Sequence, residues 1–394
     1  MRIAFVSTNL GAGTGGVADY VAALAREVRG ERCRPFLLAI ADPGVGWPET
    51  GEEDGIASLR LPRSDPWATR VAAAQKVLAE FRPDWVSLQF VCYGFNPKGV
   101  ILREGPWLSR LLRPWPLQVM MHELWVGPLP GPASAKLKAV RWLQRWSILA
   151  LLRSTAPRLV HTSNSVYREL LAEAGIEAGI LTLFGNFPVR ADADRGWLEA
   201  RIAEAIRERG ALEPLRLGFF GGVAPEWDPR PVFARIAAAA TSVGRMPIIL
   251  SGGRSGDIAA RMEGWRRAFP DLRFLALGAL TGEQVSAYLQ GLDFGLTSYP
   301  YALLGKSSSA AAMFEHGVPL IAAWGDVRPD LAPVSGDVAD LALPPTADLA
   351  RLFAYPPPKS PRPSRLPEVA HRLIADLDRA DLSLERDMRP AVLG

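Results

Sequence analysis

The feature that most constrains this chain is an alternation of short apolar runs with longer helical patterns. In the first half the runs predict strands at 2–7, 35–41, 85–90, 117–121, 158–162 and 180–184. The helical patterns between them predict helices at 17–29, 66–81, 98–112, 134–153 and 165–174. Continuous apolar strands of this length are typical of a parallel sheet that helices cover on both faces.

The alternation restarts after a polar stretch at 190–213. The second half predicts strands at 215–220, 247–250, 272–277, 294–297 and 318–322, and helices at 230–240, 256–269, 282–290 and 307–316. A segment with six prolines at 355–367 and a helix at 368–380 follow. We therefore predict an α/β chain with two doubly wound sheets facing a cleft. Its parts are expected at 1–190, 191–213 (a linker), 214–345 and 346–394 (the proline-rich linker and terminal helix).

The composition excludes several classes of protein. Two cysteines, Cys33 and Cys92, cannot build a disulfide framework. The four histidines stand at least 39 positions apart, so no zinc-protease spacing occurs. The apolar run at the start is too short for a signal peptide, and no stretch is long and apolar enough to span a bilayer. We expect a cytoplasmic protein, placed there or on the inner face of the membrane.

Positive charge is concentrated in the first half. Between Lys98 and Arg168 eleven basic residues stand against two acidic ones. No aromatic RNA-binding pattern accompanies them, so nucleic acid is not the expected partner. The predicted helix at 134–153 combines basic residues with Trp142 and Trp146, which suggests docking on an anionic membrane. The alternative is an ordinary amphipathic helix that packs on the sheet.

A glycine-rich loop follows the first predicted strand and includes Gly15 and Gly16. Glycines let backbone N–H groups approach an anion at a helix N-terminus. Gly11, Gly13 and Gly16 match the dinucleotide pattern, but the acidic partner expected about 20 residues later is displaced to Asp42. We favour a ligand-lining loop, and a dinucleotide site or a plain tight loop stays open.

His122, followed by Glu123, closes the predicted strand at 117–121. Ligands of open α/β sheets bind at the carboxyl ends of strands. An imidazole there can donate to a substrate hydroxyl near pH 7. The alternative is a strand-end histidine bonded to backbone. His161 is expected in the core or crevice wall, and His371 on the surface of the last helix.

Lys306 precedes three serines, Ser307, Ser308 and Ser309, at the start of a predicted helix. It is the one lysine between Lys138 and Lys359. A lysine, hydroxyl groups and a helix N-terminus together form an anion site that needs no metal. The alternative is an exposed lysine beside a helix cap.

Turns of small residues end three predicted strands of the second half. The first contains Gly221 and Gly222, and equivalent turns contain Ser251, Gly278 and Leu280. Together with the segment at Lys306 they predict a nucleotide pocket at one sheet edge.

These residues together resemble the GT-B glycosyltransferases, and among them the retaining family 4 enzymes. The resemblance covers roughly 1–323 and rests on the motifs Gly15–Tyr20, His122, Gly185–Phe187, Phe220–Gly222, Leu277–Gly278 and Gly317–Ile321. It implies two Rossmann-like domains and transfer of a sugar from a nucleotide diphosphate sugar, without a metal ion or other cofactor. It places acceptor binding at Gly15, Gly16 and Glu123, and donor binding in the second domain. His122 would contact the donor sugar, and a glycan or lipid-linked molecule would be the acceptor.

The sequence departs from the family at two places. Leu304 and Ala312 stand where two glutamates commonly hold sugar and ribose, although Glu315 could reach the ribose. Val223–Glu226 stands where an arginine and a lysine are common, a loss that Lys306 could offset. A non-catalytic partner protein, a sugar-nucleotide epimerase and an NAD-linked enzyme therefore remain alternatives.

Overall fold

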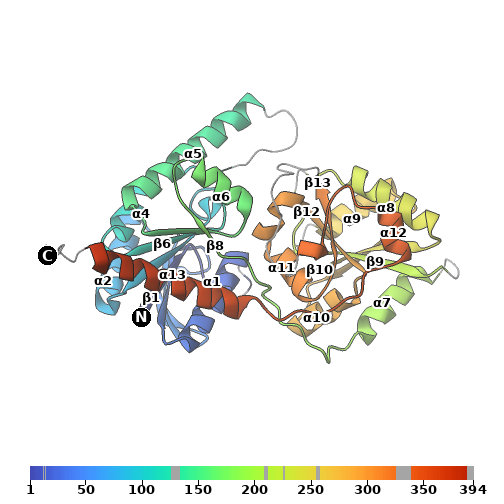
Figure 1. Cartoon of the computed structure of the whole chain (residues 1–394), viewed down its shortest axis with the longest axis horizontal. Coiled ribbons are helices and arrows are strands. Elements are labelled where there is room, and N and C mark those ends of the chain that lie inside the picture. Colours follow the sequence, from blue (N-terminus) through green and yellow to red (C-terminus); the bar gives the residue numbers. More distant parts are fainter. Residues whose placement is uncertain are drawn as a thin grey trace, which may run out of the picture. The chain divides into compact units, whose positions relative to one another are not determined.

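The chain forms two compact units (Figure 1). The structure is a computed structural model that describes residues 1–11, 13, 15–125, 134–207, 212–224, 227–253, 258–324 and 339–387. Unit 1 combines Met1–Thr182 with the C-terminal segment from Leu366, and unit 2 is Leu183–Arg365. No described helix is both long and apolar enough to cross a membrane.

In its described residues, unit 1 contains an eight-stranded sheet of order β3-β4-β2-β1-β5-β6-β7-β8. All neighbouring strands pair in parallel except β3 with β4. The strands are β1 (Arg2–Ser7), β2 (Arg34–Asp42), β3 (Glu49–Glu53), β4 (Ile56–Pro62), β5 (Trp85–Phe90), β6 (Leu117–Met121), β7 (Leu159–Thr162) and β8 (Gly179–Ile180). The helices are α1 (Gly16–Gly30), α2 (Trp67–Phe81), α3 (Cys92–Phe95), α4 (Gly105–Leu112), α5 (Ala135–Thr155), α6 (Ser165–Ala172) and α13 (Leu366–Asp387).

In unit 2 the described residues form a parallel six-stranded sheet of order β11-β10-β9-β12-β13-β14. The strands are β9 (Pro214–Phe220), β10 (Met246–Gly252), β11 (Arg273–Gly278), β12 (Phe294–Pro300), β13 (Leu320–Trp324) and β14 (Ala342–Leu343). The helices are α7 (Gly196–Ile206), α8 (Arg230–Ser242), α9 (Ile258–Ala268), α10 (Gly282–Gly291), α11 (Ser308–Glu315), α12 (Leu349–Ala354), and the 3₁₀ turns η1 (Tyr301–Lys306) and η2 (Ala339–Leu341). Two apolar clusters bury the sheet.

Local sequence signals set several helix ends. The Ser134 hydroxyl accepts a hydrogen bond from the Leu137 N–H at the start of α5. Thr281 and Gln284 form a reciprocal capping box at the start of α10. Such caps satisfy N–H groups that the helix itself leaves unpaired.

The structure corrects the predicted elements in three places. The hairpin of β3 and β4 was not predicted, because β3 is charged, although Asp54 and Gly55 take the positive φ angles of a two-residue turn. The helix predicted at 98–112 begins only at Gly105. Gly99, at φ +65°, forms a turn before it, where a Cβ would lie 2.9 Å from the Cys92 sulfur. The predicted linker at 191–213 contains α7.

The observed units also differ from the predicted boundaries. The chain leaves unit 1 after Thr182, not at 190, and the predicted strand at 180–184 shortens to β8. Gly185 belongs to unit 2, where its N–H donates to the Glu315 carboxylate. The last helix, α13, belongs to unit 1, where the Trp85 indole donates to Asp381.

Candidate functional site

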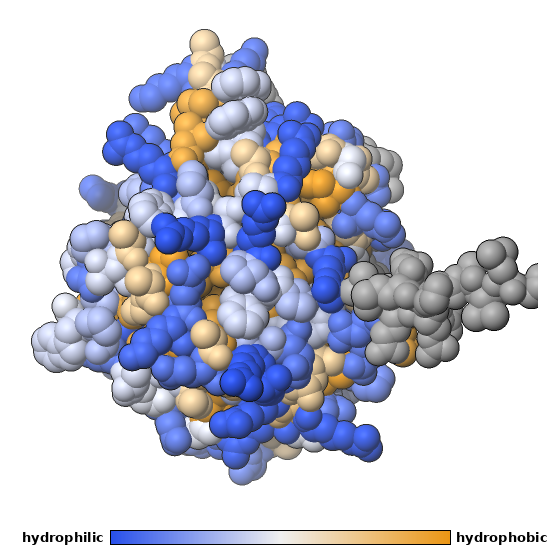
Figure 2. All heavy atoms as spheres, turned by 90° about the vertical axis from the view of Figure 1, so that its left-hand side faces the viewer, coloured by the Kyte–Doolittle hydropathy of each residue, from blue (hydrophilic) through white to orange (hydrophobic). Residues whose placement is uncertain are grey.

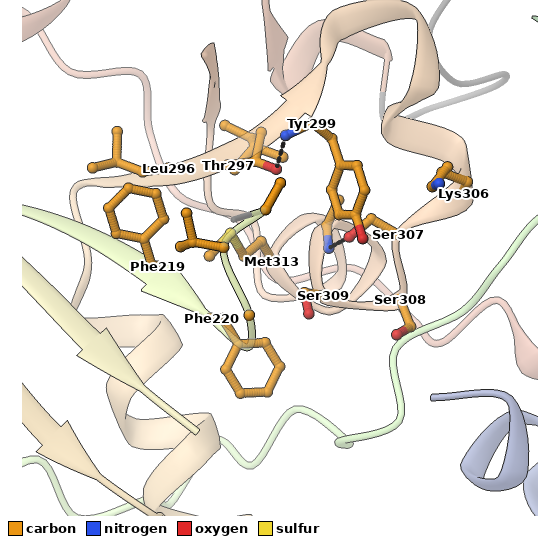
Figure 3. A pocket seen from close by; sticks show the side chains of 15 residues that line it. Phe219, Phe220, Leu296, Thr297, Tyr299, Lys306, Ser307, Ser308, Ser309 and Met313 are labelled. Atoms are coloured by element: carbon orange, nitrogen blue, oxygen red, sulfur yellow. Dashed lines mark hydrogen bonds between the residues drawn. The ribbon is translucent and has the colours of Figure 1, made fainter. Parts of the chain in front are cut away.

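A pocket of about 350 Å³ lies at the edge of the unit 2 sheet (Figure 3). It opens between β9 and β12, where the strand order reverses, the place where open α/β sheets bind ligands. It is lined by Phe219, Phe220, Gly222, Val223, Ala224, Leu296, Thr297, Tyr299, Lys306, Ser307, Ser308, Ser309, Ala310, Met313 and Leu320. The turn after β9 and the start of α11, predicted separately, therefore meet at one pocket.

Gly221 lets these two segments approach. Its φ angle is +82°, and a Cβ there would lie 2.8 Å from the Ser309 hydroxyl oxygen. A Cβ would strain the left-handed backbone and force the Ser309 hydroxyl to move. Gly222, which lines the pocket, has no neighbour within 4 Å of its Cβ position. Packing therefore requires a glycine at position 221, whereas the space beside Gly222 is open.

The start of α11 brings polar groups to the pocket. The Ser307 hydroxyl accepts from the Ala310 N–H at 3.2 Å and so caps the helix. The Lys306 Nζ lies 5.1 Å from the centre of the Tyr299 ring (Figure 3). Among the lining residues that the structure describes, Lys306 alone carries a formal charge. The pocket is therefore suited to an anion.

Three predicted donor residues do not line this pocket. Ser251 is buried within β10, Gly278 is the last residue of β11, and Leu280 follows that strand. They help to arrange neighbouring turns: the Gly253 N–H donates to the Gly278 carbonyl, and Leu280 lies against Gly252. Their positions near strand ends correctly predicted the edge of the sheet at which they lie, but they do not line the pocket.

Two aromatic side chains, Phe220 and Tyr299, form walls of the pocket. Phe220 belongs to the motif at 220–222, whereas sequence reasoning missed Tyr299. Both follow from the strand order, since they stand at the ends of the two strands that flank the switch point. The Ser298 hydroxyl also holds the first turn, because it accepts from the Ala224 N–H at 2.9 Å. Pro225 and Glu226 of the departure at 223–226 lie outside the described residues.

The positions of the two missing glutamates are apolar. Leu304 is 1% exposed and Ala312 is fully buried, and both belong to a core cluster of unit 2. Glu315 does not replace them: its Oε1 accepts from the Gly185 and Arg365 N–H groups, and burial raises the pKa of its carboxyl. The suggestion that Glu315 reaches a ribose is therefore wrong for this structure.

In unit 1, His122 and the start of α1 lie at the same end of the sheet. The His122 ring meets Tyr20 of α1 edge to face, with ring centroids 4.8 Å apart. Gly15 and Gly16, at the start of α1, are exposed, and Glu123 is half-buried. Ala12 and Thr14 of the same loop lie outside the described residues.

The His122 side chain is buried, and its Nε2 lies 2.8 Å from the Gln89 amide oxygen. That oxygen can only accept, so Nε2 carries the proton and Nδ1 has a lone pair. Burial lowers the pKa of the ring to about 3, so it is neutral at pH 7. The prediction that this imidazole donates to a substrate hydroxyl is corrected, because its donor is already used.

Asp42, the acidic residue weighed for a dinucleotide site, is also engaged. Its oxygens accept from the Leu10 and Gly44 N–H groups and from the Arg60 guanidinium. These contacts hold the pKa of its carboxyl below the usual range. A ribose would have to displace a buried ion pair, which argues against the NAD-linked alternative.

The basic helix α5 packs only in part. Gln144, Ser147 and Ile148 face the core, whereas Trp142 is 64% and Trp146 52% exposed. The N-terminal half of α5 projects beyond the unit 1 sheet (Figure 1). On the described part of unit 1, Figure 2 shows a mainly hydrophilic face with scattered hydrophobic residues. The two exposed tryptophans of α5 are therefore not part of a larger hydrophobic patch on the face that Figure 2 shows.

Among the described residues, no three histidine, cysteine, aspartate or glutamate side chains are grouped as metal ligands. The carboxylates of Asp42 and Glu315 accept hydrogen bonds from other groups of the protein, and metal independence stays a prediction.

Comparison with solved structures identifies the fold. No protein-family model and no curated protein match the sequence. The α,α-trehalose 6-phosphate synthase of Burkholderia multivorans matches with a TM-score of 0.59 and 10% identity, over 100% of this chain and 99% of that one. Anabaena HepE, solved with UDP and glucose, gives 0.54 and 13% over 98% and 99%. A putative UDP-N-acetylglucosamine 2-epimerase of Listeria monocytogenes gives 0.51 and 14% over 96% and 95%.

These matches span both units, and the chain has the GT-B fold with two Rossmann-like sheets, as the sequence predicted. At such identities the likeness establishes the fold, and the activity has to be argued from the site.

Proposed function

We propose that this chain is a glycosyltransferase that binds a nucleotide diphosphate sugar in the pocket of unit 2. One observation carries the proposal: the glycine turn after β9 and the Lys306 helix start line one pocket, and Lys306 is the one charged residue among its described lining residues. The presence of UDP and glucose in HepE, which shares the fold, supports a nucleotide sugar as donor.

Lys306 and the Ser307–Ser309 segment act on the leaving diphosphate. Negative charge grows there as the glycosidic bond breaks, and preorganised donors stabilise it by about 3 kcal/mol each. No metal is required for this step. Retention of anomeric configuration is proposed on the resemblance alone.

The acceptor side belongs to unit 1. Gly15 and Gly16 stand at the start of α1, which follows β1, and Glu123 directly follows His122 at the end of β6. The exposed basic helix α5 favours an acceptor linked to lipid, with the protein held on the cytoplasmic face of an anionic membrane.

Calorimetric titration with UDP, GDP, ADP and the matching nucleosides tests the donor site. One diphosphate should bind, and Lys306→Ala should weaken it by about 1.5–3 kcal/mol, the range for hydrogen bonds to charged groups. The nucleoside should lose much less. Lys76→Ala, at an exposed lysine of α2, is the matched control. Equal losses for the diphosphate and nucleoside would make Lys306 structural and remove the proposal's main support.

A non-catalytic partner protein is the second candidate. The observation that favours it is the apolar burial of Leu304 and Ala312, which leaves no carboxylate among the described lining residues. Tight diphosphate binding with no release of diphosphate from any sugar donor, tested with lipid-linked and glycan acceptors, would favour this reading over transfer.

A further inference from the structure

Six polar side chains form a continuous hydrogen-bonded chain through the sheet of unit 1. We call it the buried relay: His122, Gln89, Ser87, Gln118, His161 and Asp376. Its successive heavy-atom distances are 2.8, 2.7, 2.5, 3.1 and 3.1 Å. It runs from the end of β6 to helix α13, and its last link joins two residues, His161 and Asp376, that stand 215 positions apart in the sequence.

The relay lies inside the core. None of its members is more than 9% exposed. Ser87 and Gln89 are two positions apart on β5, so their side chains lie on the same face of the sheet. Ser87 pairs directly with Gln118 of β6. Gly179 of β8 makes room for the next member, because a Cβ there would lie 2.8 Å from the His161 ring. A polar chain this deep is costly unless every link is satisfied.

The terminal carboxylate sets the direction of every bond. Asp376 can only accept, so His161 must donate from Nε2 and accept at Nδ1. The Gln118 amide therefore presents its NH₂ to His161 and its oxygen to the Ser87 hydroxyl.

The same logic continues to the site. The Ser87 hydroxyl donates a hydrogen bond to the Gln118 oxygen and accepts one from the Gln89 NH₂ group. The Gln89 oxygen then faces His122, whose Nε2–H donates to it. If every hydrogen bond ran in the opposite direction, the His161 nitrogen that faces Asp376 would carry no proton. Two acceptors would then face each other at that link.

We infer that Asp376 is a positioning residue for the unit 1 site. Through the buried relay it fixes His122 as the Nε2–H tautomer and presents Nδ1 as a hydrogen-bond acceptor for a hydroxyl group of the bound ligand. This inference rests on the proposed function for the identity of that ligand, a sugar, and not for the tautomer. The guanidinium groups of Arg372 and Arg379 also donate hydrogen bonds to the Asp376 carboxylate.

Histidine-selective ¹⁵N NMR of the full chain tests the tautomer directly, since only four histidines contribute. We expect His122 and His161 as Nε2–H tautomers. His316 is an internal reference of opposite kind, because its Nδ1 donates to the Ala312 carbonyl and its Nε2 accepts from Ser286. Observation of His122 as the Nδ1–H tautomer in the unaltered protein overturns the inference, whatever any variant does.

The variant pair Asp376→Ala and Asp381→Ala then separates the relay from simple helix docking. Asp381 anchors the same helix through Trp85 and Arg158 but lies outside the relay. Asp376→Ala should add a population of Nδ1–H His122, and Asp381→Ala should leave a single tautomer. An unchanged His122 spectrum in Asp376→Ala contradicts the inference.

Affinity measurements connect the tautomer to the ligand. Asp376→Ala should weaken binding of a glycan or lipid-linked acceptor by unit 1 about two- to tenfold, the value of one hydrogen bond, while the nucleotide diphosphate binds as before. Asp381→Ala should change neither. If no nucleotide sugar binds the unaltered protein, the proposed function fails and the NMR result still decides the relay.

Discussion

The two units place polar side chains on parallel sheets in different ways. The sheet of unit 2 is mainly apolar, with small polar side chains only near the strand ends, and its pocket lies there, around Lys306 and Gly222. Unit 1 carries polar groups through the sheet itself, from His122 to Asp376. The site of unit 2 is therefore made of local sequence motifs, whereas the polar chain of unit 1 is assembled from residues far apart in the sequence.

The two arrangements have different physical costs. A pocket at a strand end leaves its polar groups in water until a ligand arrives, so each can be replaced with a limited loss. A buried chain depends on every link, because an unsatisfied member leaves a desolvated polar group in the core. We therefore expect variants of unit 2 to change binding and variants of the unit 1 core to change stability as well.

The largest effect is expected on the surface of unit 1. Reversing the charge of Lys136, Lys138, Arg141 and Arg145 should abolish sedimentation with anionic vesicles. Each basic residue near such a surface is worth about 1 kcal/mol, so the loss exceeds about 4 kcal/mol. Binding should fade as salt rises.

Nucleotide binding by unit 2 is the control for this variant and should not change. If the unaltered protein fails to sediment with anionic vesicles even at low salt, the membrane proposal is wrong and a soluble acceptor replaces it.

The next effect compares two adjacent glycines of unit 2. Gly221→Ala should lower the free energy of unfolding by about 1–2 kcal/mol, because its φ of +82° is left-handed, and should also weaken nucleotide binding by displacing Ser309. Gly222→Ala, with open space around it, should change the free energy of unfolding by less than about 0.5 kcal/mol, so its effect on binding can be measured without a loss of stability. Urea unfolding and calorimetric titration measure both, and equal effects of the two variants would contradict the packing argument.

The fold was predictable because its signals are local. Apolar runs located β1, β2, β5, β6 and β9 to within a residue or two. The β3–β4 hairpin was missed because β3 is an exposed charged edge strand, and only Asp54 and Gly55 marked its turn. The return of α13 to unit 1 depends on contacts with Trp85, far away in sequence, which no local pattern contains.

The same contrast governs the candidate sites. The pocket of unit 2 was foreseen because Lys306 and the glycines at 221–222 stand in contiguous, chemically unusual segments. Ser251, Gly278 and Leu280 resembled them in position but not in geometry. The role of Gln118 and His161 could not be foreseen, since each is a single polar residue in an apolar strand and gains meaning only from its neighbours in the sheet.

Acid should distinguish the units. Burial lowers the pKa of His122 from 6.5 to about 3. Below pH 6.5 this histidine therefore binds a proton in the unfolded chain but stays neutral in folded unit 1. Stability is fully present above pH 6.5 and falls by about 1.4 kcal/mol per pH unit, or about 2 kcal/mol at pH 5. The lowered pKa of His161 adds to this loss. In unit 2, the lowered pKa of His316 is opposed by the raised pKa of Glu315.

Hydrogen-exchange mass spectrometry at pH 7 and pH 5, corrected for the intrinsic exchange rate, measures this difference. Peptides of β5, β6 and β7 should lose more protection than those of β9, β10 and β12. His371→Gln, at an exposed position of α13, should behave as the unaltered protein. Greater loss in unit 2 would contradict the assignment of neutral buried histidines to unit 1.

The smallest expected effect is a null one, and it concerns the metal. In unit 2 the positive charge next to the pocket comes from Lys306 and the start of α11, and the lining residues described there include no carboxylate that could hold a divalent cation. A diphosphate bound this way should not need one, since the lysine and helix N–H groups meet its charge directly. Excess EDTA should therefore change the diphosphate affinity by less than about 0.5 kcal/mol, whereas Lys306→Ala should lower it with or without EDTA. A tenfold loss in EDTA that Mn²⁺ or Mg²⁺ restores would show that the metal, and not the lysine, carries the donor charge.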